Sequence, residues 1–195
     1  MPSPPSPITQ ANGDQLTGAD GRMQMCTQAG NAPAAGSPLY CTADITCQVN
    51  GVAQSCTYVA VLTPTAGAPY MAVSQRVVLG LADTQVFMGA LAANPATGQV
   101  GVVAIGVATA APTQTECASL FFRVDGATGT VTQSVAVAES AYLYDRDYAV
   151  GRVGDYNDAS LDEANVFYGA AERGLPNATL PFVNWATNIF TTALA

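Results

Sequence analysis

The sequence predicts an all-β protein that is built from divergent strand-and-turn units and contains disulfides. Short segments rich in Val, Thr and Ala recur between turn dipeptides such as Asp20-Gly21 and Asn50-Gly51. Helical periodicity is weak throughout the chain. Four of the five cysteines fall within one short, turn-rich stretch, residues 26–56. Repetition without helices favours partial β-propeller-like repeats, with a β-sandwich as the alternative.

Length and composition narrow the class of protein. At 195 residues, with only 10% charged side chains, the chain is long enough for a single domain with a sizeable core. It contains neither Lys nor His. That absence excludes Ser-His-Asp and Cys-His nucleophile systems, His-containing zinc sites and Schiff-base lysines. A chain with a net charge of −8 does not attract the negatively charged backbone of a nucleic acid.

The chain begins with a Pro- and Ser-rich stretch, residues 1–12, which predicts an extended tail. We expect one all-β domain from residue 13 to 195, made of about three units at 13–67, 68–137 and 138–195. In the first unit, Asp20-Gly21 predicts a hairpin that pairs 15–17 with 23–26. Asn50-Gly51 predicts a second hairpin between two longer strands.

The cysteines predict a disulfide framework, because their spacing matches no metal-binding pattern. The four candidates are Cys26, Cys41, Cys47 and Cys56, and Cys117 is left over. Such a framework predicts an oxidising, extracellular compartment and therefore a secreted protein. The disulfide partner of Cys47 stays open, because it depends on the length of the loop at Asn50-Gly51. A two-residue turn would place Cys47 opposite Gln54, so that Cys47 would form its disulfide elsewhere. A four-residue loop would place Cys47 opposite Cys56 and allow a disulfide between them.

The second unit carries the strongest strand signals. Strands are predicted at 74–81, 86–92, 98–108, 118–125 and 130–137. Residues 84–115 contain no charged side chain, so their strands are either central or meet a partner. If they are exposed, they supply the apolar surface that assembly needs. The longest apolar run, 100–111, is too short for a membrane helix.

The third unit is rich in charged residues, in contrast to the charge-free segment of the second unit. Fourteen of the twenty charged residues follow residue 115. Carboxylates crowd one span, and Asp145, Asp147 and Asp158 are candidate ligands for Ca²⁺, which prefers several oxygen donors. The alternative is a solvated acidic loop in which Asp side chains cap turns.

Three segments resemble a known family. The run Gly151-Arg152-Val153-Gly154-Asp155-Tyr156 is similar to the Arg-Trp-Gly-Asp-Tyr motif of secreted bacterial β-propellers related to sialidases and BNR-repeat proteins. Residues 166–172 and 184–190 resemble the strands that follow it in the last blades. The likeness covers about the last 110 residues. Val153 replaces the usual Trp, and the closing strand lacks its Gly and Arg.

The resemblance implies about three blades, roughly half of such a propeller. Half a propeller leaves two open blade edges. Two copies could close a ring, copies could add head to tail into a filament, or the chain could be one piece of a larger assembly.

The resemblance also implies site residues. Sialidases use a Tyr nucleophile with a Glu partner and an arginine clamp, so Tyr156, Glu172 and Arg152 are the candidates here. No Asp-box motif is present, and a structural corner formed by Arg152 and Asp155 is the alternative. Trp185 and Tyr144 are candidates for stacking on a glycan, and Asp155 is a further candidate ligand-binding residue. Packing is the alternative use of the two aromatic side chains.

These observations favour a secreted, non-catalytic structural or interaction protein. It would assemble through its β edges with itself or with a partner chain, as a closed ring or a filament. The alternative is a carbohydrate-binding or sialidase-like propeller. No resident cofactor is expected apart from the candidate Ca²⁺, and neither a nucleic-acid partner nor a membrane span is expected.

Overall fold

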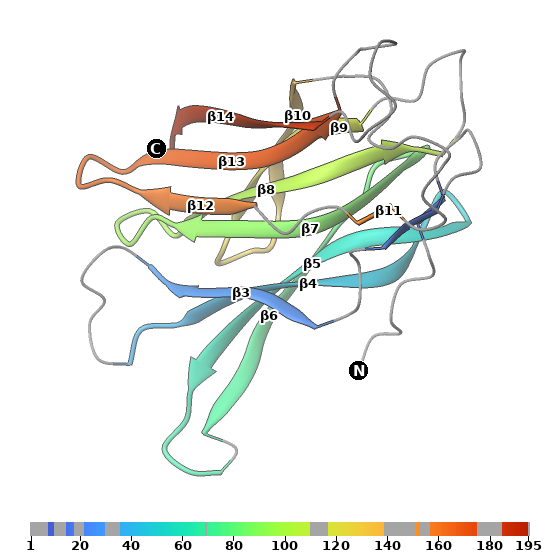
Figure 1. Ribbon diagram of the computed structural model, residues 1–195. Coiled ribbons are helices and arrows are strands. Elements are labelled where there is room, and N and C mark those ends of the chain that lie inside the picture. Colours follow the sequence, from blue (N-terminus) through green and yellow to red (C-terminus); the bar gives the residue numbers. More distant parts are fainter. Residues whose placement is uncertain are drawn as a thin grey trace.

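The computed structural model describes residues 8–9, 15–17, 22–29, 36–68, 70–109, 117–138, 151–152, 157–174 and 185–194. The described residues form strands and turns and contain no helix, which confirms the all-β class. Most strands belong to three antiparallel sheets, called here the first, central and third sheets, in which neighbouring strands follow the order of the chain (Figure 1).

Each large sheet is a meander. The first sheet contains β3 (Met23–Gln28), β4 (Leu39–Val49), β5 (Val52–Pro64) and β6 (Met71–Leu79). The central sheet contains β7 (Thr84–Ala93), β8 (Gln99–Ala108), β9 (Cys117–Asp125) and β10 (Val131–Ala138). The third sheet contains β12 (Asp158–Leu161), β13 (Val166–Gly174) and β14 (Trp185–Ala193).

The three sheets stack as layers around two cores. One core lies between the first and central sheets and includes Val59, Leu79 and Phe122. The other lies between the central and third sheets and includes Phe121 and Phe167. The result is a stack of repeated meanders, and none of the described sheets closes on itself.

Strand β8 occupies the middle of this stack. Its side chains from Val100 to Val107 are buried, because the central sheet is covered on both faces. A strand buried on both faces needs a continuous apolar run and no alternation. The described part of the charge-free segment, residues 84–109, is therefore central, and β7 and β8 do not supply an exposed assembly surface.

One predicted hairpin is confirmed and one is wrong. Asn50 and Gly51 both have positive φ values, 52° and 82°, and form the two-residue turn between β4 and β5. Asp20 and Gly21 lie outside the described residues, but the two strands that they were expected to join, 15–17 and 23–26, are not paired with each other. Instead β2 (Gln15–Thr17) pairs with β1 (Ile8–Thr9) and with β11 (Gly151–Arg152), while β3 pairs with β4. The dipeptide signal is local, and it does not account for these distant pairing partners.

The sheets also divide the chain differently from the expected units. The first unit was expected to end at residue 67, but β6 is hydrogen-bonded to β5 and belongs to the first sheet. The chain passes to the central sheet through residues 80–83. Three meanders remain, with borders displaced from the predicted ones.

Candidate functional site

A buried polar cluster joins the three sheets at a β-bulge in β7. The register between β7 and β8 shifts between Phe87 and Ala90, and Met88 has a positive φ of 56°. A bulge turns backbone groups away from the ladder, so they need other partners. Asp44 of β4 supplies one, because both of its carboxylate oxygens lie 3.0 Å from the Met88 nitrogen and accept its N–H.

The remaining groups of the bulge are bonded from both neighbouring sheets. Thr42 Oγ1 donates to the Gly89 carbonyl at 2.5 Å. Asn157, which precedes β12, donates its Nδ2 to the Met88 carbonyl at 2.6 Å. The same Asn157 accepts the backbone N–H of Glu172 in β13 through Oδ1, at 3.1 Å. One bulge in the central sheet is thus connected to both outer sheets.

Burial identifies the role of this cluster. Thr42, Asp44 and Thr57 have no exposed surface. Asp44 also accepts from the Gln24 amide at 2.5 Å and from the Thr57 hydroxyl at 3.4 Å. A carboxylate so enclosed cannot reach a substrate, and its hydrogen bonds offset the cost of burying it. The cluster therefore aligns the layers and is not a catalytic centre.

Two disulfides use the four predicted cysteines. Cys26 in β3 is bonded to Cys41, which lies directly opposite it in β4. Cys47 is bonded to Cys56, although the register places Cys47 opposite Gln54. The second bond is diagonal, with a Cα–Cα distance of 5.9 Å. The expectation that a two-residue turn would send Cys47 elsewhere is therefore wrong, because diagonal neighbours share a face.

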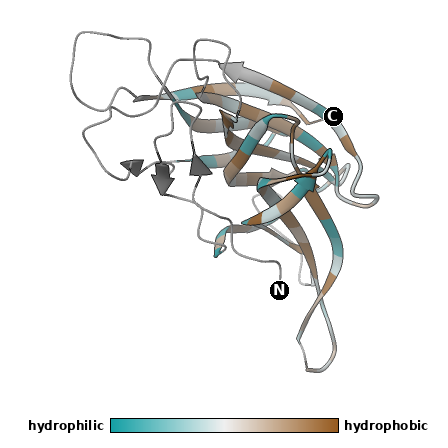
Figure 2. Cartoon of the chain, turned by 90° about the vertical axis from the view of Figure 1, so that its right-hand side faces the viewer, coloured by the Kyte–Doolittle hydropathy of each residue, from teal (hydrophilic) through white to brown (hydrophobic). Residues whose placement is uncertain are grey.

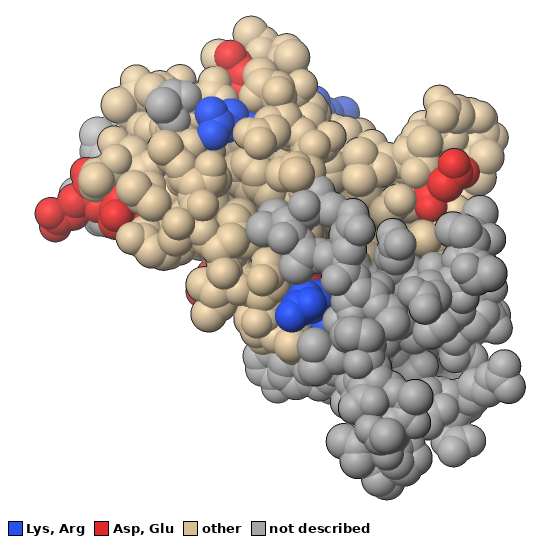
Figure 3. All heavy atoms as spheres, turned by 90° about the horizontal axis from the view of Figure 1, so that it is seen from above, with Lys and Arg blue, Asp and Glu red and all other residues tan. Residues whose placement is uncertain are grey.

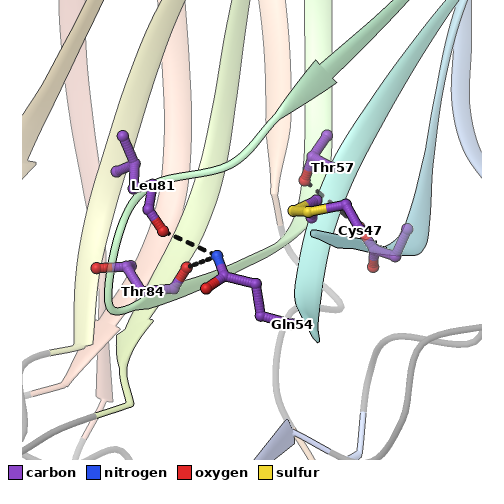
Figure 4. Close-up of a disulfide and its surroundings, with 7 residues drawn as sticks. Cys47, Gln54, Thr57, Leu81 and Thr84 are labelled. Atoms are coloured by element: carbon purple, nitrogen blue, oxygen red, sulfur yellow. Dashed lines mark hydrogen bonds between the residues drawn. A yellow bond between two sulfur atoms is a disulfide. The ribbon is translucent and has the colours of Figure 1, made fainter. Parts of the chain in front are cut away.

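The Cys47–Cys56 bond sits where the first sheet passes to the central sheet. Gln54, opposite Cys47, donates its Nε2 to the carbonyls of Leu81 and Thr84, at 2.8 and 2.6 Å (Figure 4). Gly80 packs so closely on this bond that an added Cβ would lie 2.8 Å from the Cys56 sulfur. The disulfide and Gln54 together hold the connection between the two sheets.

Strand β10 is the most exposed regular strand edge among the described side chains. It is the outermost strand of the central sheet, and β9 is the only strand paired with it among the described residues. The side chains from Val131 to Val135 are all exposed, with Val131 at 41% and Val135 at 44%. The strand carries no charge, and its regular stretch, Gln133–Ala136, lies between two register shifts.

The structure brings few of the predicted site residues together. Glu172 lies in β13 and is only 3% exposed, so it is not open to a substrate. Asp158 is exposed at the start of β12, and one carboxylate oxygen accepts the N–H of Ala159. Among the described residues, no three His, Cys, Asp or Glu side chains are grouped as a metal site.

Other predicted residues are described only in part or not at all. The backbone of Arg152 lies in β11, and that of Trp185 begins β14, opposite Gly174. The register therefore places Trp185 near the end of β13 that holds Glu172, whereas Arg152 belongs to the separate small sheet. Tyr144, Asp145, Asp147, Asp155 and Tyr156 lie outside the described residues.

Sequence reasoning missed the cluster around Asp44. The one available signal was an acidic residue inside an otherwise uncharged strand, Leu39–Val49, where a charge is expected to be paired or bonded if buried. Nothing local identifies Met88 as its partner, because 44 residues separate them.

None of the described residues form a helix that is long and apolar enough to cross a membrane.

Comparison with known proteins adds no relative. No protein-family model, curated protein or solved structure matches the chain.

Proposed function

We propose that this chain is a secreted, non-catalytic structural protein that assembles with further copies of itself through an exposed strand edge. One observation carries the proposal: β10 ends the central sheet as an uncharged strand with side chains exposed on both faces. An open edge of this kind is a template for pairing with another strand. The two disulfides fit an oxidising compartment.

A second copy is the partner that suits this edge. Two β10 strands can pair antiparallel about a two-fold axis, because an isologous interface presents the same patch from both subunits. No charge in the strand opposes that approach. Edge strands that remain single are usually protected by Lys, Pro or another covering element, and Val131–Ala138 contains neither of those residues.

The catalytic alternative has less support. The sialidase-like hypothesis needs an accessible Glu172, and that side chain is buried. The glycan-binding hypothesis rests on Trp185 and Tyr144, whose side chains lie outside the described part of the chain.

Light scattering after size exclusion tests the proposal. The wild-type chain is expected to exceed the monomer mass, and Val135→Lys should lower that mass by placing a charge in the middle of the pairing stretch. Ala96→Lys adds the same charge at an exposed turn between β7 and β8 and should leave the mass unchanged. A wild-type chain that stays monomeric at all concentrations tested would refute self-assembly.

A further inference from the structure

The two ends of the layered stack each carry exposed apolar side chains. The face of the first sheet turned away from the central sheet is called here the first outer face. The corresponding face of the third sheet is called the last outer face. The central sheet lies between the two outer sheets, so these faces look away from one another.

Strand register places the exposed apolar side chains of the first sheet on a single face. Met23 lies opposite Ala43, Ala43 opposite Tyr58, and Tyr58 opposite Val78. Met23 and Val78 are 54% and 46% exposed. Their neighbours Val77 and Leu79 point the other way, into the core. Val73 and Val52 share the first outer face by the same register, and both are exposed.

A projecting hairpin extends this face. Beyond the pair Leu39 and Leu62, β5 and β6 pair only with each other, and the hairpin stands out from the body (Figure 2). Residues 62–75 contain no charged side chain, and Tyr70 near the tip is 74% exposed. A two-stranded hairpin is marginally stable alone and gains from packing on another surface.

The last outer face is the counterpart. Tyr168 is 41% exposed and Ile189 is 73% exposed. Ala170 lies opposite Asp158 in β12 and opposite Ile189 in β14. Tyr168 lies two residues before Ala170 in β13 and opposite Thr191. Because side chains two residues apart in a strand point to the same side of the sheet, these side chains share a face. Seen from the side of β14, the surface is largely uncharged, with a few separate patches of acidic and of basic atoms (Figure 3).

The charges on the two faces are complementary. Arg76 lies opposite Ala60 on the first outer face and is the only charged residue of β3–β6 apart from the enclosed Asp44. The last outer face has Asp158 exposed in its row, and Asp162 and Glu163 follow in the adjoining turn. One face therefore carries a cation and the other carries carboxylates.

We propose that the last outer face of one copy packs on the first outer face of a second copy. Ile189 and Tyr168 would cover Val78 and Met23, and Asp158 would approach Arg76. The stack of sheets would then continue from one chain into the next, at the spacing of about 10 Å that packed sheets adopt. This inference rests on the proposed self-assembly and names a contact separate from the β10 edge.

The two faces differ, so the contact is heterologous. Such contacts close into a ring where the rotation permits and otherwise extend into a filament. Because each copy presents both faces, a charge introduced on one face blocks one side of every molecule. The complementary charge on the opposite face of another molecule should restore the contact.

Two variants and their mixture test the stacking. Ile189→Lys and Val78→Glu should each reduce the association constant at least tenfold in light scattering. An equimolar mixture should regain the wild-type mass, because the introduced lysine and glutamate would pair across one interface and the other would stay native. Unchanged assembly of both single variants, or a mixture that stays dispersed, would overturn the proposal. Circular dichroism verifies that each variant is folded.

Cysteine trapping tests the same contact independently, in chains that carry Cys117→Ser. A mixture of Val78→Cys and Ile189→Cys chains should give a covalent heterodimer on mild oxidation. Pairing of Ile189→Cys chains only with one another would contradict a heterologous contact. Both proposals fall if the wild-type chain is monomeric. Stacking alone falls if Val135→Lys disperses the assembly while Ile189→Lys and Val78→Glu do not.

Discussion

Asp44 in the first sheet accepts the backbone N–H of Met88 in the central sheet with both of its carboxylate oxygens, each at 3.0 Å. The Asp44 side chain is fully buried, and Met88 sits in a bulge with positive φ. A bulged N–H facing a core would otherwise have no ladder partner. This bond therefore fixes where the central sheet bends and how the first sheet lies over it.

Asp44→Ala should destabilise the fold by about 2–4 kcal/mol, because the Met88 N–H and the Gln24 amide would lose a buried acceptor. Asp44→Asn should cost less, since one oxygen can still accept from Met88, although its amide would face the Gln24 donor. Gln48→Ala, at an exposed site of the same strand, is the control. Urea unfolding measures all three. Equal stability of Asp44→Ala and Gln48→Ala would contradict the assigned role.

Gly89→Ala should lower stability by about 1–3 kcal/mol, because its new Cβ would collide with Cγ2 of Thr57. Thr57→Ser removes that methyl group and keeps the hydroxyl that donates to Asp44. Gly89→Ala should therefore cost less stability in a chain that also carries Thr57→Ser than in the wild-type chain. Gly67→Ala, with no atom near its added Cβ, is the control. A double-mutant cycle with no coupling would contradict this packing.

Asn94 links the turn between β7 and β8 to the end of β14. Its Oδ1 accepts the N–H of Ala96 at 2.8 Å, and its Nδ2 donates to the Leu194 carbonyl at 2.5 Å. In Asn94→Asp the turn acceptor remains, but a carboxylate would face the Leu194 carbonyl. The folded pKa of that carboxyl should rise, so the stability lost at pH 7 should be partly regained as the pH is lowered and the carboxyl is protonated. Thermal unfolding at several pH values measures this, and a deficit that does not change with pH would refute it.

Replacing either disulfide by an alanine pair should cost about 3 kcal/mol in loop-closure entropy, because the bonds span 15 and 9 residues. Loss of Cys26–Cys41 should cost more than loss of Cys47–Cys56. It frees β3, whose Gln24 bonds to Asp44 and whose Met25 sulfur accepts the N–H of Leu91. Guanidinium unfolding of both double variants gives the order, and the reverse order would contradict this account of β3.

Asp125 makes stability acid-dependent at the turn between β9 and β10. The N–H groups of Thr128 and Ala127, 3.0 and 2.9 Å from Oδ1, lower the pKa of its carboxyl. A lowered folded pKa means that the stabilisation is present above the unfolded pKa of about 4 and is lost as the pH falls through the folded value. The melting temperature of the wild-type chain should therefore exceed that of Asp125→Asn at pH 6, and the difference should decrease as the pH is lowered below about 4. A constant difference would argue against this origin.

Local rules predicted much of the secondary structure. Asn50-Gly51 formed its two-residue turn because both residues accept positive φ. The strands expected at 118–125 and 130–137 are observed at Cys117–Asp125 and Val131–Ala138. The charge-free run produced β8, because only apolar side chains suit a strand covered on both faces. The site residues Tyr156 and Arg152 were inferred from a motif and not from contacts, and their roles stay predictions.

The sequence by itself determined the all-β class, the alternation of strands and turns, and which four cysteines would form disulfides. These features follow from residue type and from neighbours in the chain. Only the tertiary structure decided that Asp44 would meet Met88, that Cys47 would reach Cys56 diagonally, and that β10 would end the central sheet with β9 as its one strand partner among the described residues. Each depends on which sheets stack and in what register. That choice is made by the summed burial of many distant side chains, which no short stretch of sequence encodes.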